Sequence, residues 1–223
     1  MKAPGSFDDL VYRRGILEIK YPRSHTYWDA SGSLIARVEQ EMPGLVVQGL
    51  ETDGFRFDGN EASGISAAKF YWDKIIIEPV STGTHLGPFA EACGKFWGIV
   101  RDGLGVGKIY RMGNRYGYFF SGDVHPKDML SGISVWQPSA STADFGKPSS
   151  DGIALRFENP AADRRIRVEI VQVETNIRNA EKVGIILDID FTTLADAALD
   201  VDVAEFVRAN QRFIKTHLHQ LLR

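Results

Sequence analysis

The sequence holds a single cysteine, Cys93, among 223 residues. No disulfide can therefore form within the chain, and a lone thiol fits a protein kept in a reducing compartment. A run of 18 apolar residues, long enough to cross a bilayer as a helix, is also absent. The first ten residues show no basic segment followed by an apolar one, so we do not expect a secretory signal. These absences favour a cytoplasmic location and no membrane partner.

The short motifs that usually identify an enzyme are missing as well. The sequence contains no G-x-S-x-G, H-E-x-x-H or C-x-x-C pattern and no Rossmann glycine fingerprint. Charge of one sign is not in excess either, because 26 basic residues face 29 acidic ones and the formal net charge is -3. This balance disfavours nucleic acid as a partner, although it is compatible with a local basic patch. The sequence therefore leaves enzymatic activity open but favours a protein without it.

What the chain does have is a mixture of strand and helix patterns. Strands are expected at residues 15–21, 45–50, 55–57, 67–80, 108–120, 133–136, 153–157, 165–173 and 184–191. Helices are expected from a cap at Asp29 or Ser31 to Met42, over 86–104, and over about 202–222, where Asp202 has capping spacing. This order predicts an α+β fold, in which a large, mostly antiparallel sheet has about three helices packed against it.

No internal repeat or linker divides the sequence, so we expect a single domain over residues 1–223. We expect a flexible N-terminus at 1–10 and a mobile loop at 138–152, which is rich in Ser, Gly and Pro. Inside the second helix, Gly94 and Gly98 lie one turn apart. Glycine costs about 1 kcal/mol relative to alanine there. The pair therefore predicts close approach by a neighbouring element.

The sharpest local feature is the segment Arg111-Met-Gly-Asn-Arg115-Tyr, which opens an expected strand. Alternate residues of a strand share a face, so Arg111 and Arg115 point the same way with Gly113 between them. Later in the chain, Asp188 and Asp190 share a face of another expected strand. If the two strands are neighbours, these four charges can meet.

Three interpretations of these charges follow. The arginines and aspartates can form an ion-pair network that sets the register of the strands. Alternatively, Arg111 and Arg115, with Arg165 and Arg167 from a nearby strand, can bind a phosphate or carboxylate through their planar donor groups. Thirdly, Asp188 and Asp190 can hold Mg²⁺, in a chain that otherwise needs no cofactor.

Three stretches resemble a sporadically distributed family of uncharacterised prokaryotic proteins, whose members are a little longer than this chain. They are Leu17–Pro22; Phe70–Tyr116, which ends in Arg-x-Gly-x-Arg-Tyr; and Leu187–Phe191 with the helix that follows. Gly117 stands where that family usually has asparagine, and residues 121–152 do not align with it. The resemblance implies a shared α+β architecture and supplies no activity or catalytic residue.

From the residues, we expect a non-enzymatic accessory module that binds a partner protein or a small anionic ligand, and that can form a homo-oligomer. The alternative is a metal-dependent enzyme acting on a phosphorylated or nucleotide-like substrate, with Asp188 and Asp190 holding the cation.

Overall fold

A computed structural model of the chain describes residues 10–51, 54–80, 88–121, 152–159, 163–177, 180–194 and 201–221. The strands are β1 (Val11–Lys20), β2 (Val46–Glu51), β3 (Gly54–Asp58), β4 (Ile65–Tyr71), β5 (Lys74–Pro79), β6 (Arg111–Ser121), β7 (Gly152–Asn159), β8 (Arg164–Ile177) and β9 (Ala180–Thr193). The helices are α1 (Tyr27–Glu41), α2 (Phe89–Leu104) and α3 (Val203–Leu221). Among these helices, none combines the length and the apolar composition that crossing a membrane requires.

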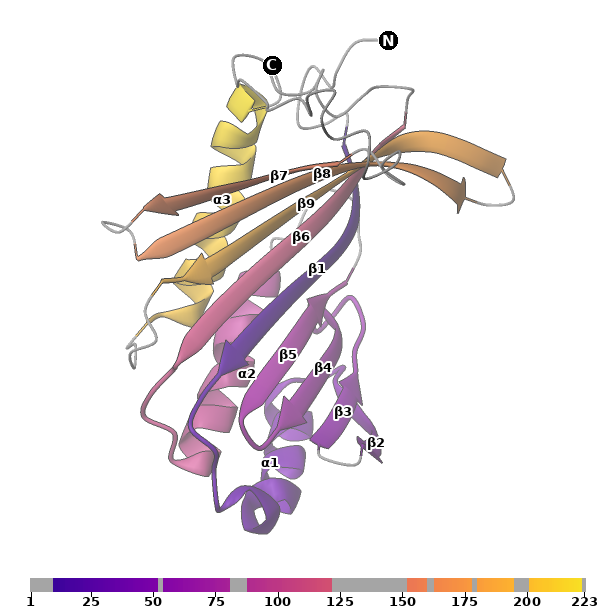
Figure 1. The fold of residues 1–223 in the computed structure, drawn as a ribbon. Coiled ribbons are helices and arrows are strands. Elements are labelled where there is room, and N and C mark those ends of the chain that lie inside the picture. The colour runs from indigo at the N-terminus through magenta and orange to yellow at the C-terminus, as the bar shows by residue number, and fades with distance from the viewer. Residues whose placement is uncertain are drawn as a thin grey trace, which may run out of the picture.

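All nine strands belong to one sheet, in the order β2-β3-β4-β5-β1-β6-β9-β8-β7 (Figure 1). Every pair of neighbours is antiparallel. The first strand of the chain lies at the centre, where it pairs with β5 on one side and β6 on the other. The predicted α+β class with a large antiparallel sheet is therefore confirmed.

Several predicted strand ends differ by up to four residues, and two predictions are wrong in kind. The single strand expected at residues 67–80 is a hairpin, because β4 and β5 pair with each other and turn at Trp72 and Asp73. Apolar residues on both sides of this short turn hide it in the sequence. Helix α1 begins at Tyr27 with Thr26 as its N-cap, so neither Asp29 nor Ser31 caps it. By contrast, Asp202 does cap α3, since its Oδ1 accepts a hydrogen bond from the Glu205 amide at 3.0 Å.

Other expectations fall outside the described residues. They are the strand at 133–136, nearly all of the loop at 138–152, and the N-terminal residues 1–9. Gly152, the last residue of that loop, belongs to β7, and Leu10 is buried.

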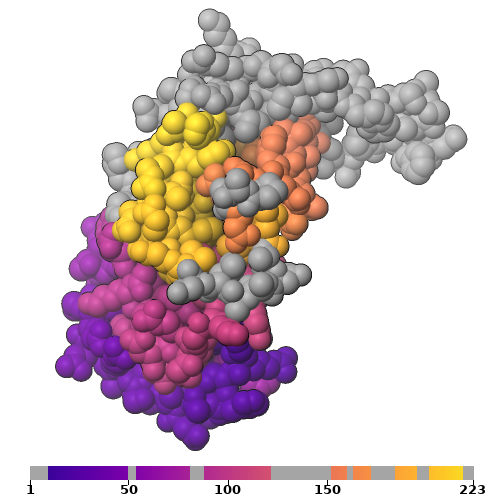
Figure 2. Space-filling model, turned by 90° about the vertical axis from the view of Figure 1, so that its left-hand side faces the viewer, coloured from indigo at the N-terminus to yellow at the C-terminus, as the bar shows by residue number. Residues whose placement is uncertain are grey.

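The three helices lie on one side of the sheet (Figure 1). Ring contacts join the layers: Phe57 of β3 meets Phe96 of α2 with centroids 6.0 Å apart, and Phe191 of β9 meets Phe213 of α3 at 5.7 Å. Helix α2 contacts both α1 and α3, and Figure 2 shows α3 beside the part of the chain that contains α2 and β6. The opposite face of the sheet carries charged side chains and is covered by no described helix.

The buried core on the helix side consists of two clusters. Asn114 lies between them along β6, and Asn210 lies between them along α3. Both side chains are buried, yet the Asn114 Oδ1 and both amide atoms of Asn210 make no hydrogen bond to the described residues. Unpaired polar atoms of this kind are costly, and they are uncommon in protein cores. A polar boundary therefore separates the two halves of the core.

The two helix glycines have different surroundings. A Cβ atom at Gly94 would lie 3.0 Å from the Cβ of Ala204 in α3, whereas one at Gly98 would have no described atom within 4 Å. The predicted close approach thus holds at Gly94 alone, and α3 is the element that approaches.

We predict that alanine substitutions at these two positions differ in effect. Gly98→Ala gains helix propensity in open space and should raise the free energy of unfolding by up to about 1 kcal/mol. Gly94→Ala gains the same propensity but pushes against Ala204, so its stability should rise less or fall. Chemical denaturation of both variants measures the difference. Equal gains would contradict the close contact between α2 and α3.

Candidate functional site

Strand β6 lies between β1 and β9, and this register brings the predicted charges together. Arg115 is directly opposite Asp190, and Gly117 is directly opposite Asp188. Directly opposite residues of antiparallel strands share a face, so Arg111, Arg115 and both aspartates lie on the open face of the sheet. The two strands are neighbours, so the condition under which the four charges can meet is fulfilled.

Asp188 is the centre of an ion-pair network. Arg115 donates to it twice, through Nε to Oδ1 at 2.7 Å and through a terminal nitrogen to Oδ2 at 2.5 Å. Arg14 of β1 donates to the same Oδ2 at 2.9 Å. Asp188 is only 7% exposed, so its charge depends on these two arginines for compensation. The network connects three adjacent strands.

Gly117 allows the Arg14 side chain to reach Asp188. It faces Arg14 on one side and Asp188 on the other, and a Cβ at this position would lie 3.0 Å from the Arg14 Cγ. The Arg14 side chain therefore crosses β6 above a residue that has no side chain. The glycine at which this sequence departs from the resembled family has a structural reason here.

The two aspartates have opposite electrostatic environments. Burial alone would raise the pKa of Asp188, but the hydrogen bonds from Arg115 and Arg14 outweigh it and lower the pKa. The pKa of Asp190 is raised, because burial and the charge of Asp188 outweigh the attraction of the arginines around it. Only Asp188 is therefore stabilised as an anion by the fold.

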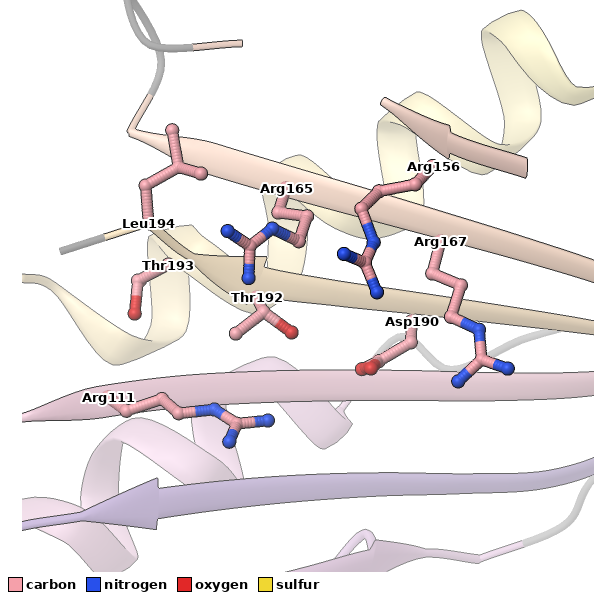
Figure 3. A pocket seen from close by; sticks show the side chains of 8 residues that line it. All are labelled: Arg111, Arg156, Arg165, Arg167, Asp190, Thr192, Thr193 and Leu194. Carbon is pink, nitrogen blue, oxygen red and sulfur yellow. The ribbon is translucent and has the colours of Figure 1, made fainter. Parts of the chain in front are cut away.

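Asp190 belongs to a second arrangement, a pocket of about 240 Å³ on the open face (Figure 3). The pocket lies beside the network and takes residues from four neighbouring strands. Its arginines are Arg111 from β6, Arg165 and Arg167 from β8, and Arg156 from the edge strand β7. Asp190, Thr192, Thr193 and Leu194 complete the lining. Four guanidinium groups thus surround one carboxylate.

The pocket arginines are only partly compensated. Arg165 pairs with Glu158 at 2.8 Å and Arg167 with Glu169 at 3.0 Å, and both glutamates are partly exposed. Neither Arg111 nor Arg156 forms an ion pair with any residue in the described ranges. Across β7 and β8, Arg156 stands directly opposite Arg167. Two like charges in this position repel each other, so the unliganded pocket carries an excess of positive charge.

The structure divides the predicted residues into two groups. Arg111, Arg165 and Arg167 line the same pocket, as the anion-binding interpretation expects, whereas Arg115 lies in the ion-pair network with Asp188. Sequence reasoning missed Arg156 and Arg14. The alternation of Ile153, Leu155 and Phe157 shows that Arg156 points to the opposite side of its strand, but it does not show that this strand pairs with β8. Arg14 acts across an intervening strand, and sequence spacing does not show such a contact.

The surroundings of the two aspartates favour an anion-binding surface over a metal site. Both oxygens of Asp188 accept hydrogen bonds from arginine, and Asp190 is surrounded by four more. In the part of the chain that the structure describes, no group of three or more Asp, Glu, His or Cys side chains is arranged to hold a metal. Cys93 is fully buried in α2, and burial raises the pKa of its thiol, as expected for a small core residue.

Comparisons with known proteins found no matching family model and no matching curated protein. The resemblance described above therefore stays a prediction, and the function must be argued from the site itself.

We predict opposite effects for two conservative substitutions. Asp188→Asn should lower the free energy of unfolding by about 1–3 kcal/mol at neutral pH, because it removes charge-assisted hydrogen bonds from two half-exposed arginines. Asp190→Asn should leave stability unchanged or raise it, because it removes a carboxylate whose ionisation the fold opposes. Urea denaturation of both variants tests this pair.

The pH dependence of the stability of these two variants follows from the pKa shifts of Asp188 and Asp190. The folded pKa of Asp188 lies below its ordinary value of 3.8, so its stabilising effect is complete above that value. The loss of unfolding free energy in Asp188→Asn should therefore become smaller as the pH falls through 3.8 towards the folded pKa of Asp188. The folded pKa of Asp190 lies above 3.8, so any gain from Asp190→Asn should appear as the pH rises above that value. Effects of the same sign for both variants would contradict this assignment.

Proposed function

We propose that this protein is a binding module whose open sheet face holds a small oxyanion, a phosphate or carboxylate group, in the pocket of Arg111, Arg156, Arg165 and Arg167. The observation that supports this most is the convergence of four arginines from three strands on one pocket with a single carboxylate. Arginine presents a planar set of donors that matches the oxygens of phosphate and carboxylate.

Energetics favour an anion in this place. Bringing Arg156 opposite Arg167 costs free energy, and among the described residues Glu169 forms an ion pair with Arg167 but not with Arg156. An oxyanion between the guanidinium groups would remove that repulsion and satisfy donors of Arg111 and Arg156. Thr192 lies at the floor of the same pocket and offers a hydroxyl for an additional hydrogen bond (Figure 3).

Beside the pocket, Gly113 is directly opposite Thr192. A Cβ at Gly113 would approach no described atom more closely than 4.0 Å. The absence of a side chain leaves room for a ligand between Arg111 and the network of Arg115. The ion-pair network then acts as a support, because it holds β6 and β9 in the register that forms the pocket.

The proposal includes an accessory role without catalysis, and it leaves cytoplasmic location and self-association as expectations. The alternative, a metal-dependent enzyme, would use Asp188 and Asp190 with Mg²⁺. The arginine contacts of Asp188 disfavour it, since a divalent cation would have to displace two guanidinium groups.

We predict that Arg111→Gln weakens the binding of inorganic pyrophosphate at least tenfold. A hydrogen bond to a charged group contributes about 1.5–3 kcal/mol, and 1.4 kcal/mol corresponds to a tenfold change in affinity. Isothermal titration calorimetry at low salt measures the effect. Arg156→Gln should act in the same way without loss of stability, because neither arginine forms an ion pair among the described residues.

Arg56→Gln provides a matched control. Arg56 lies on the open face of β3, far along the sheet from the pocket, and pairs with the exposed Asp58 at 2.8 Å. Its removal changes the net charge equally but should leave pyrophosphate binding intact. If phosphate, pyrophosphate and citrate all fail to bind the wild-type protein at millimolar concentration, the proposed function is wrong.

A further inference from the structure

A second set of positive charges continues from the pocket across the sheet. Arg111 of β6 is directly opposite Lys20 of β1, and Lys20 is directly opposite Lys74 of β5. Three cations therefore stand in one row on three adjacent strands, spanning about 10 Å. Like charges directly opposite each other destabilise a sheet. Carboxylates near the row are Glu18, whose Oε1 lies 3.7 Å from the Lys20 Nζ, and Asp190, which lines the pocket with Arg111.

Exposed aromatic side chains lie at the same end of the sheet. Tyr110, just before Arg111, is 46% exposed, and its amide donates to the Lys20 carbonyl at 2.8 Å. Trp72, in the turn before Lys74, is 39% exposed, and the guanidinium of Arg23 lies 4.6 Å from its ring centroid. The ends of β1 and β4 and the starts of β5 and β6 thus combine cations with accessible rings.

A groove extends this surface around the end of β1. It has a volume of about 460 Å³ and is lined by the segment after β1 and the segment between α2 and β6. Its ionisable side chains are Arg23, His25 and Lys108, and no carboxylate is among its lining residues. The lining of this groove therefore carries positive charge, although the whole chain carries -3.

We infer that single-stranded nucleic acid binds around this end of the sheet. Its phosphates would lie along Arg111, Lys20 and Lys74, and its bases would stack on Tyr110 and Trp72. Proteins bind single strands with a cationic track beside aromatic rings, because every base has a flat face that stacks. A small anion alone would need the pocket but would need neither the lysine row nor the exposed rings.

This inference rests on the proposed function, because Arg111 belongs to both the pocket and the row. The two can still be separated by experiment. Lys20 and Lys74 do not line the pocket, and Arg156 does not belong to the row. Variants of these residues should therefore affect different ligands.

The test is fluorescence anisotropy with a labelled single strand of about twelve thymidines, beside calorimetry with pyrophosphate. The double variant Lys20→Gln/Lys74→Gln should bind the oligonucleotide at least tenfold more weakly and bind pyrophosphate unchanged. Tyr110→Ala should weaken oligonucleotide binding at least fivefold, while Tyr110→Phe, which keeps the ring, should bind like the wild type. With about three phosphate contacts, raising the salt from about 50 to 200 mM should weaken wild-type binding by about 20-fold.

Three results would overturn the inference. Absence of oligonucleotide binding while pyrophosphate still binds would refute the nucleic-acid assignment and leave the proposed function intact. If the wild-type protein binds neither the oligonucleotide nor pyrophosphate, both this inference and the proposed function are refuted. If inorganic polyphosphate competes fully and Tyr110→Ala has no effect, the ligand is a phosphate chain without bases. Arg56→Gln serves again as the control, and it should retain binding of both probes.

Discussion

The candidate site depends on the hydrogen-bonded ion pairs between Asp188 and its two arginines. A slip of β6 by one residue would turn every side chain of that strand to the other face. Such a slip would move Arg115 away from Asp188 and would place Tyr116, which is fully buried, in solvent. The network on one face and the core on the other therefore enforce the same register. The pocket of Arg111, Arg156, Arg165 and Arg167 exists only while that register is kept.

The open face and the helix face perform different tasks in this molecule. Apolar residues hold the helix face to α1, α2 and α3, while the open face presents charges that are only partly compensated. Rows of like charge across neighbouring strands are uncommon in a purely structural surface because they cost stability. Among the described strands, cations stand directly opposite each other at Arg156 with Arg167, at Lys20 with Arg111 and Lys74, and at Arg56 with Lys69. A ligand of opposite charge gives the first two rows, which share or adjoin the pocket, a physical reason.

Local sequence patterns predicted the elements well and the site in part. Alternation along Ile185–Phe191 and helical spacing along α2 depend on near neighbours, so the sequence shows them directly. The pairing of Arg115 with Asp188 could be predicted from the sequence, because both strands carry spaced charges on one face. The contact between Arg14 and Asp188 could not be predicted, because it crosses an entire strand and connects residues 174 positions apart. Net charge likewise describes the whole chain and cannot locate a basic row made by register.

The asparagines between the two core clusters have a consequence for how the protein responds to mutation. Substitutions in separate, independently packed regions add in their effects, whereas those that share partners do not. Changes at Leu17 or Phe96 in one cluster and at Ile170 or Leu187 in the other should therefore combine as simple sums. Helix α3 and strands β1 and β6 contribute to both clusters, so cooperativity between the halves passes through these three elements. The protein can consequently vary one half of its core while the half beneath the arginine pocket is preserved.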